Sequence, residues 1–195
     1  MSRIVVFLSI TLDGVIQAPG RPDEDTRGGF AHGGWAAPYA DPVMGELAAE
    51  GMANTGGLLF GRRTYEDFYG FWPNQPEPNP FTAHLNATQK YVASNTLQEP
   101  LPWQNSTLLS GDATEAVAEL RSGEGKDLVV LGSGALVRSL SRTDLVDEYD
   151  LLVHPLILGS GRRLFEGDAL PRKLELMSTN TTTTGVILAT YRPAA

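Results

Sequence analysis

The sequence predicts an α/β fold, in which helices cover a mostly parallel sheet that ends in antiparallel strands. Short apolar runs, such as residues 58–60 and 128–131, alternate along the chain with amphipathic stretches. This alternation is typical of the strands and crossover helices of a parallel sheet. The last two runs, residues 173–183 and 186–191, are joined around a Thr-Gly turn. They predict a C-terminal antiparallel hairpin.

Local signals place the boundaries of the elements. Asp41 is a favourable N-cap and Pro42 suits the first position of a helix, which Gly56-Gly57 is expected to break. Asp112 and Glu115 form a capping box that opens another helix. In chain order we expect a strand over residues 3–11, a helix from 42, a strand over 58–60, a helix from 64, a proline-rich connection over 71–80, strands over 90–94 and 106–110, a helix from 113, a strand over 128–131, a helix from 135, a strand over 148–158 and then the hairpin.

Composition limits the number of domains and the class of partner. A chain of 195 residues suits one well-buried domain, so we expect residues 1–195 to form one. The net charge of −8 argues against nucleic acid as a partner, because phosphate-backbone binding needs clustered cations. Neither disulfides nor a metal site are expected from a chain without cysteine and with three scattered histidines. Residues 1–10 are too short to span a membrane and meet Asp13-Gly14 too soon for a signal peptide, which predicts a cytoplasmic protein.

The stretch between the first strand and the first helix, residues 17–39, is rich in glycine, proline and aspartate. A loop of this length inside a compact domain is usually functional or disordered. It also contains Phe30 and Trp35, which are poor choices for a solvated linker. We therefore expect a lid or a pocket wall here, with a disordered surface loop as the alternative.

Small polar or basic groups follow three of the predicted strands: Gly61-Arg62-Arg63-Thr64, Ser94-Asn95 and Gly132-Ser133-Gly134. The carboxyl ends of parallel strands meet at one edge of a sheet, so these groups should converge there. By itself, the Gly-Ser-Gly segment is better explained as an ordinary turn, since it lacks the complete dinucleotide or P-loop pattern. Three such strand ends together favour a dinucleotide ligand.

The same segments carry a family resemblance. Residues 12–16, 59–65, 92–95, 130–136 and 147–154 resemble, in order, segments of the dihydrofolate reductase superfamily. The closer resemblance is to the branch that contains the reductase domain of the bifunctional riboflavin-biosynthesis deaminase-reductase, and it extends over residues 3–191. It implies a dihydrofolate reductase-like three-layer fold, with helices on both faces of an eight-stranded sheet.

The resemblance also implies a site for NADPH. The backbone of Ser9 and Ile16 would meet the nicotinamide carboxamide, and Thr64 and the Gly-Ser-Gly turn would hold the pyrophosphate. The implied cofactor-binding residues are Ser9, Ile16, Gly61, Arg62, Arg63, Thr64, Ser94, Asn95, Gly132, Ser133, Gly134, Ala135 and Leu136. The expected substrate pocket consists of Trp35, Tyr65, Phe68, Leu131 and Val153.

The chain departs from the folate reductases at the proton donor. Those enzymes carry an acid at the start of the first helix, partnered by a threonine. Here Asp41 and Glu46 are weak candidates for such an acid because neither has the matching spacing, and Val153 replaces the threonine. A helix cap or a solvated helix face is the alternative role for each acid. We do not expect dihydrofolate reduction. His154, within a predicted strand, is expected to be structural.

The sequence thus predicts an NADPH-dependent oxidoreductase that transfers a hydride to a small heterocyclic substrate. The substrate would be of pyrimidine or pteridine type, as in 5-amino-6-(5-phosphoribosylamino)uracil reductase. The alternative is a non-catalytic NADPH-binding or regulatory module on the same fold. No membrane partner is expected. The resemblance further implies a homodimer, and the terminal hairpin offers strand edges to bury.

Overall fold

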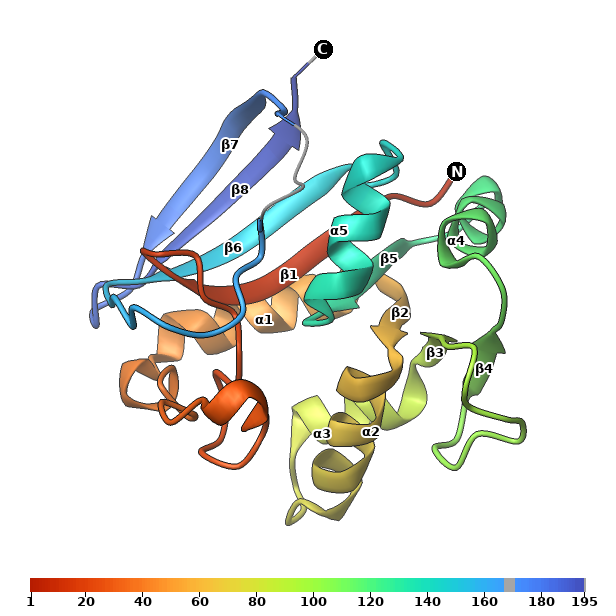
Figure 1. Ribbon diagram of the computed structural model, residues 1–195, viewed down its shortest axis with the longest axis horizontal. Helices are drawn as coiled ribbons and strands as arrows, with labels where there is room; N and C mark the ends of the chain where they lie inside the picture. Colours follow the sequence, from red (N-terminus) through yellow and green to blue (C-terminus); the bar gives the residue numbers. More distant parts are fainter. Residues whose placement is uncertain (167–170, 195) are drawn as a thin grey trace.

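The computed structural model describes residues 1–166 and 171–194. Its strands are β1 (Ile4–Thr11), β2 (Thr55–Gly61), β3 (Gln89–Ala93), β4 (Ser106–Leu109), β5 (Asp127–Leu131), β6 (Glu148–His154), β7 (Leu174–Thr181) and β8 (Ile187–Pro193). They form one eight-stranded sheet in the order β4-β3-β2-β5-β1-β6-β8-β7 (Figure 1). The strands from β4 to β6 in this order pair in parallel, whereas β8 is antiparallel to both β6 and β7. The predicted sheet and its C-terminal hairpin are confirmed.

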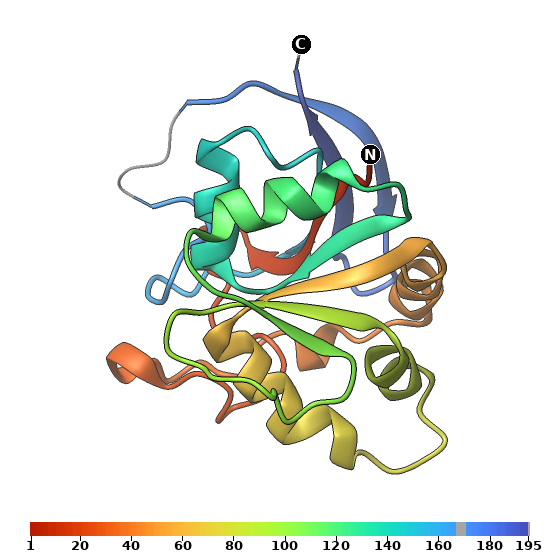
Figure 2. The same ribbon diagram turned by 90° about the vertical axis from the view of Figure 1, so that its right-hand side faces the viewer.

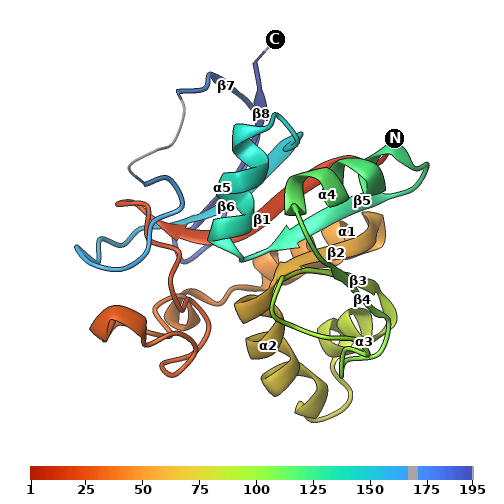
Figure 3. The same ribbon diagram turned by 45° about the vertical axis from the view of Figure 1, so that its right-hand side comes forward.

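Helices lie on both faces of this sheet (Figures 2 and 3). They are α1 (Pro42–Asn54), α2 (Arg62–Phe71), α3 (Pro80–Ala87), α4 (Ala113–Ser122) and α5 (Gly134–Arg142), with short 3₁₀ turns η1 (Arg27–Gly29), η2 (Ala37–Tyr39) and η3 (Trp72–Asn74). Alternate residues of β1 enter different apolar clusters: Ile4 and Val6 pack with α4 and α5, and Val5 packs with α2 and α3. In the described part of the chain, no helix is long and apolar enough to cross a membrane.

Some element boundaries differ from the prediction. α1 ends at Asn54, before the two glycines, and Gly57 lies inside β2. Glycine is needed at this position of the strand because a Cβ there would come within 2.9 Å of the Tyr91 ring and 3.0 Å of Leu128. Helix α3 was not predicted, although Asn79 caps it by accepting a hydrogen bond from the Thr82 N–H at 3.1 Å. Strand β6 ends at His154 and not at residue 158, since the next residue is a proline without an N–H for the ladder.

The stretch of residues 17–39 has its own apolar cluster, contrary to the alternative of a disordered loop. Val15, Phe30 and Trp35 are buried together, and Leu156 packs against them. The indole N–H of Trp35 donates to the Gln17 carbonyl at 2.7 Å. In turn, the Gln17 side chain accepts from the backbone N–H of residue 162 at 3.0 Å. These contacts dock the stretch on the segment that follows β6.

Lys90 in β3 is fully buried beside the C-terminal end of α3. Its ammonium group donates to the carbonyls of Leu85 at 2.7 Å and Thr88 at 2.6 Å, and it lies 4.8 Å from the centre of the Trp103 ring. Burial lowers the pKa of Lys90 to about 8. The folded protein therefore releases this proton at a lower pH than the unfolded chain does.

We predict that Lys90→Met lowers the free energy of unfolding by about 1–3 kcal/mol near pH 8, because two buried carbonyls lose their donor. An unfolded lysine has a pKa of about 10.4. Between about pH 8 and pH 10 the unfolded chain binds the proton that the folded protein has lost, so the stability of the wild type should rise relative to the variant by at most about 3 kcal/mol. Urea unfolding of both proteins across this range measures the difference. A difference independent of pH would contradict the assignment.

Candidate functional site

Two helices begin side by side at the carboxyl edge of the sheet without a side-chain cap. β2 and β5 are neighbours, and α2 and α5 follow them directly. No side chain of the described residues caps the first turn of either helix, whereas Asp41, Asn79 and Asp112 cap α1, α3 and α4. Uncapped N–H groups at a helix N-terminus favour an anionic ligand.

The Gly132-Ser133-Gly134 turn explains why α5 lacks a cap. Ser133 occupies the capping position, but its hydroxyl accepts a hydrogen bond from the Gly61 N–H at 2.8 Å. A Cβ on Gly134 would lie 2.4 Å from the Ile16 side chain, and one on Gly132 would lie 3.2 Å from Thr64. The turn thus brings together predicted cofactor residues from three separate segments and needs glycine for the close approach.

No strand of the described residues pairs with the edge of β1 beside this turn. β1 pairs with β5 as far as Phe7, opposite Leu131, but continues beside β6 to Thr11. Ser9 therefore lies where β1 extends past the end of β5, as a contact to a nicotinamide would require. The N–H of Ile16, by contrast, already donates to a backbone carbonyl at residue 162, at 2.9 Å, so it is not available to a cofactor.

Arg62 and Ser94 follow two neighbouring strands. β2 pairs with β3, with Gly61 opposite Ala93. The Arg62 guanidinium lies 3.5 Å from Glu66, one turn along α2, and both side chains are partly exposed. Arg63 is exposed. Two arginines therefore stand at the uncapped start of α2.

The polar groups after β3 are used within their own loops. The Ser94 hydroxyl accepts from the N–H groups of Thr96 and Leu97, both at 3.1 Å. Asn95 clamps Gly111, accepting from its N–H at 2.6 Å and donating to its carbonyl at 3.2 Å. Asn95 thus has a structural role in joining two loops.

The groups at the starts of α2 and α5 could hold the phosphates of an anionic cofactor. The first turn of α5, from Gly134 through Ala135 to Leu136, offers backbone N–H groups, since its first described helical hydrogen bond is donated by Val137. Leu136 is buried, so only its backbone could contact a ligand. Guanidinium groups suit the phosphate on the adenosine ribose.

Two residues predicted for the substrate pocket, Phe68 and Leu131, are partly buried and pack against the same apolar cluster as Phe7, which pairs with Leu131 across β1 and β5. Phe7 also borders the cluster beneath α1, which includes Leu152 and Met44. It therefore connects the carboxyl edge with α1. Nothing in the apolar run of residues 3–11 distinguishes Phe7 from its buried neighbours, so the sequence analysis missed it.

Two other residues predicted for this pocket lie elsewhere, which corrects the prediction. Tyr65 is 1% exposed, and its hydroxyl accepts from the Trp103 N–H at 3.0 Å and donates to Ser106 at 3.3 Å. It is a core residue between α2 and the sheet. Val153 packs with the cluster beneath α4 and α5, because alternate residues of β6 face opposite sides and Leu152 faces Phe7.

Trp35, also predicted for the pocket, is buried in the cluster of the 17–39 stretch. Its ring meets His154 edge-on at 5.1 Å, and Tyr39 meets the same imidazole at 5.5 Å. His154 is fully buried with its Nδ1 atom 2.9 Å from the Leu152 carbonyl, and burial lowers its pKa. Trp35 and His154 thus support the stretch from within.

Neither weak catalytic candidate on α1 is placed to act on a substrate. The Asp41 carboxylate accepts from the Val43 N–H at 2.8 Å, from the Thr183 N–H at 2.9 Å and from the Thr183 hydroxyl. These bonds, the Thr183 hydroxyl first, hold the pKa of Asp41 below its usual value. Glu46 is exposed. The roles of cap and solvated helix face therefore apply.

The sequence analysis missed a connection between the 17–39 stretch and α2. Arg21 donates to the Asp67 carboxylate at 2.5 Å, and its guanidinium lies 4.2 Å from the centre of the Phe71 ring. Asp67 follows Thr64 by three residues and precedes Phe71 by four, so all three share one face of α2. The stretch is thereby tied to the helix face that borders the glycine turn.

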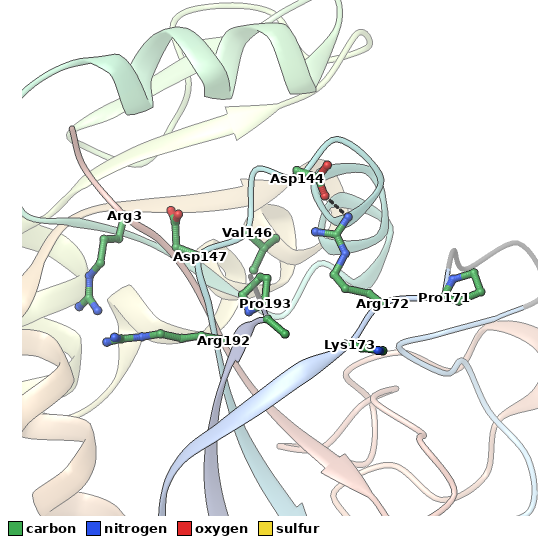
Figure 4. A pocket seen from close by; sticks show the side chains of 10 residues that line it. Arg3, Asp144, Val146, Asp147, Pro171, Arg172, Lys173, Arg192 and Pro193 are labelled. Atoms are coloured by element: carbon green, nitrogen blue, oxygen red, sulfur yellow. Dashed lines mark ion pairs between the residues drawn. The ribbon is translucent and has the colours of Figure 1, made fainter.

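An open hollow of about 780 Å³ lies at the other edge of the sheet, near the amino ends of β1 and β6. Its lining includes Arg3, Arg172 and Arg192 (Figure 4). Arg172 points to Asp144 across the hollow, and Arg3 and Arg192 both pair with Glu148. Because acids of this edge already neutralise these arginines, the hollow is a poorer anion site than the carboxyl edge.

Known proteins resemble this chain in sequence and in fold. The family model of the RibD C-terminal domain matches residues 2–188. The Uncharacterized protein YyaP of Bacillus subtilis (strain 168) is 28% identical over 194 residues, which cover 97% of this chain and 94% of YyaP. A pyrimidine reductase-like protein from Corynebacterium diphtheriae superposes with a TM-score of 0.67 at 13% identity, over 100% of this chain and 92% of that one. Dihydrofolate reductase from Enterococcus faecalis, complexed with NADP(H) and RAB-propyl, superposes with a TM-score of 0.61 at 14% identity, over 99% of this chain and 97% of that one. The predicted dihydrofolate reductase-like fold is confirmed.

We predict that Asp41→Asn lowers the melting temperature at neutral pH and leaves the binding of NADPH within about twofold. The carboxylate stabilises the fold while it is ionised, so its contribution is present above the unfolded pKa of about 3.9 and is lost as the pH falls through the lower folded value. The difference in melting temperature should therefore shrink toward about pH 3. Glu46→Gln, at an exposed position of the same helix, is the control and should match the wild type. Weaker ligand binding at an unchanged melting temperature would assign Asp41 to the site.

Proposed function

We propose that the chain, which belongs to the RibD C-terminal domain family, is an NADPH-dependent reductase. Its substrate in this proposal is a small heterocycle of pyrimidine or pteridine type. The observation that carries the proposal is the pair of neighbouring helix N-termini, of α2 and α5, that no described side chain caps. Arg62 and Arg63 stand at the first of them. An anionic dinucleotide suits these groups, and we propose that the protein acts in the cytoplasm.

In this proposal the protein supplies position and bound NADPH supplies the hydride. The N–H groups of α5 and the Thr64 hydroxyl hold the pyrophosphate. The unpaired edge of β1 at Ser9 orients the nicotinamide toward the substrate. Phe7, Phe68 and Leu131 form an apolar surface on which a planar ring can lie, with water excluded from the reacting carbon.

A non-catalytic NADPH-binding module is the second candidate. It is favoured by α1, which presents Met44 and Leu47 to the apolar cluster on the sheet and carries no acid there. Such a module would bind NADPH through the same helix N-termini and would transfer no hydride. Dihydrofolate is not the proposed substrate, because Asp41, the acid just before α1, is engaged as the cap of that helix.

Incubation of the pure protein with NADPH and a panel of pteridines, ribosylaminopyrimidines and reactive carbonyls separates the candidates. A reductase should oxidise NADPH above background with at least one member of the panel. Binding of NADPH without oxidation would favour the module. If NADPH neither binds nor raises the melting temperature, both candidates fail and the glycines are only turns.

We predict that Arg62→Ala weakens the binding of NADPH by about ten- to a hundredfold and leaves the binding of NADH unchanged. The reason is that a charge-assisted contact to the 2′-phosphate, which NADH lacks, is worth about 1.5–3 kcal/mol. Calorimetric dissociation constants of both cofactors measure this. Glu66→Gln is the matched variant: it removes the carboxylate that pairs with Arg62 at 3.5 Å and should leave NADPH binding equal or tighter. Equal affinity of the wild type for NADPH and NADH would mean that Arg62 only pairs with Glu66.

We also propose a homodimer that buries the outer strand of the terminal hairpin. β7 is exposed along its whole length, and Leu176, Met177 and Ile187 are 56%, 49% and 41% exposed. Sedimentation at micromolar concentration should give a dimer, and Leu176→Asp should give a monomer because it places a charge in the interface. A wild-type monomer of 21.0 kDa would contradict the proposal.

A further inference from the structure

The proposed reduction needs a proton as well as a hydride, and the two acids of α1, Glu46 and Glu50, are exposed to solvent. Burial raises the pKa of Glu24, Asp67 and Asp150, the carboxyl groups of the described residues with this direction of shift. A raised pKa lets a carboxyl group keep its proton closer to neutral pH, as a general acid must. The proton donor is therefore sought among these three.

Geometry separates the three carboxyl groups. Asp150 accepts from the Thr190 hydroxyl at 2.6 Å, and the charges that act on it are those of Arg3, Asp127 and Glu148 at the amino edge of the sheet. That edge is opposite the uncapped helices. Asp67 is paired with the Arg21 guanidinium at 2.5 Å, which favours its ionised form.

Glu24 lies in the stretch that follows the carboxyl end of β1, and no ion pair among the described residues includes it, although the charge of Arg21 lowers its pKa as well. Its Oε2 atom accepts from the N–H groups of Gly20 at 2.7 Å and Arg21 at 3.1 Å, and no donor among the described residues reaches its Oε1 atom. Gly33 packs against the backbone of the same turn, where a Cβ would lie 2.5 Å from the Pro22 carbonyl. The turn thus holds one carboxyl oxygen and leaves the other free for a ligand.

Arg21 joins this turn to the candidate site. Its backbone N–H binds Glu24, while its guanidinium binds Asp67 and lies over Phe71. Asp67 shares its helix face with Thr64, beside the glycine turn, and is adjacent to Phe68 in the apolar group. Figures 1 and 3 show the 17–39 stretch beside α2, near the carboxyl end of β1.

We propose that Glu24 is the proton donor of the reduction and that Arg21 and Asp67 are its positioning residues; this rests on the proposed function. The hydride adds to the electrophilic carbon of the heterocycle, and the dihydronicotinamide is oxidised. The O–H bond of Glu24 breaks and its proton moves to the ring nitrogen or carbonyl oxygen next to that carbon. The resulting carboxylate takes a proton from water before the next turnover.

The kinetic test compares Glu24→Gln with Glu119→Gln. Glutamine keeps an oxygen that can accept from Gly20 and Arg21, and Glu119 is an exposed acid on α4, away from Arg21 and Asp67. With a substrate found in the panel, Glu24→Gln should slow hydride transfer at saturating NADPH by about a hundredfold or more, with an unchanged dissociation constant for NADPH. Glu119→Gln should leave both quantities unchanged. Equal rates for all three proteins would overturn the proposal.

The pH dependence tests the two positioning residues. Hydride transfer by the wild type should slow as the pH rises through the raised pKa of Glu24, because the protonated form is required. Asp67 raises this pKa and Arg21 lowers it. Asp67→Asn should therefore move the decline to lower pH and Arg21→Ala should move it to higher pH. A purely structural role would shift neither, and two unchanged profiles would remove both residues from the proposal.

A binding test needs no cofactor and no turnover. Protonated 2,4-diaminopyrimidine can donate an N–H group to the free oxygen of the Glu24 carboxylate, and its dissociation constant is measured by NMR titration near pH 7. Glu24→Gln should weaken the binding of this probe by about tenfold or more, and Glu119→Gln should not. No binding by the wild type, or equal binding by Glu24→Gln, would overturn the role of Glu24. A protein that binds this probe through Glu24 but does not bind NADPH would instead overturn the proposed function.

Discussion

The site depends on where the hydroxyl of Ser133 is directed. A serine at a helix N-cap usually accepts from its own helix, but here the left-handed backbone of Ser133, with φ of 55°, accompanies a hydrogen bond from Gly61. This one bond ties the end of β5 to the end of β2. It also leaves the N-terminus of α5 uncapped. The same turn places Gly134 against Ile16, so segments after β1, β2 and β5 meet at one point.

The sequence predicts this convergence because parallel strands place their carboxyl ends at one edge whatever the loops do. It could not predict which way single side chains face. Val153 was one residue out of phase on β6, and Tyr65 was assigned to a pocket although α2 turns it into the core. The contact of Arg21 with Asp67 joins residues far apart in the chain, so no local pattern reveals it. Arg21-Pro-Asp-Glu-Asp was visible as a charged loop only.

Two carboxylates show how surroundings assign different roles to similar side chains. Asp41 accepts three described hydrogen bonds, two of them from Thr183, and its pKa is lowered. Glu24 accepts two backbone bonds on one oxygen, lies next to Asp67, and its pKa is raised by burial. Donors to both oxygens stabilise the ionised form, whereas burial with one oxygen unpaired does not. A cap and a proton donor thus differ in their partners more than in their residue type.

Charge is distributed unevenly between the two edges of the sheet. At the amino edge Arg3, Arg172 and Arg192 are all paired with acids. At the carboxyl edge no described side chain caps α2 or α5, and Arg62 pairs with Glu66 at 3.5 Å, where both side chains are partly exposed. For a protein with a net charge of −8, the general field repels an anionic ligand. Unneutralised positive groups then decide where such a ligand can bind, and these lie at the carboxyl edge, beside the apolar group of Phe7, Phe68 and Leu131.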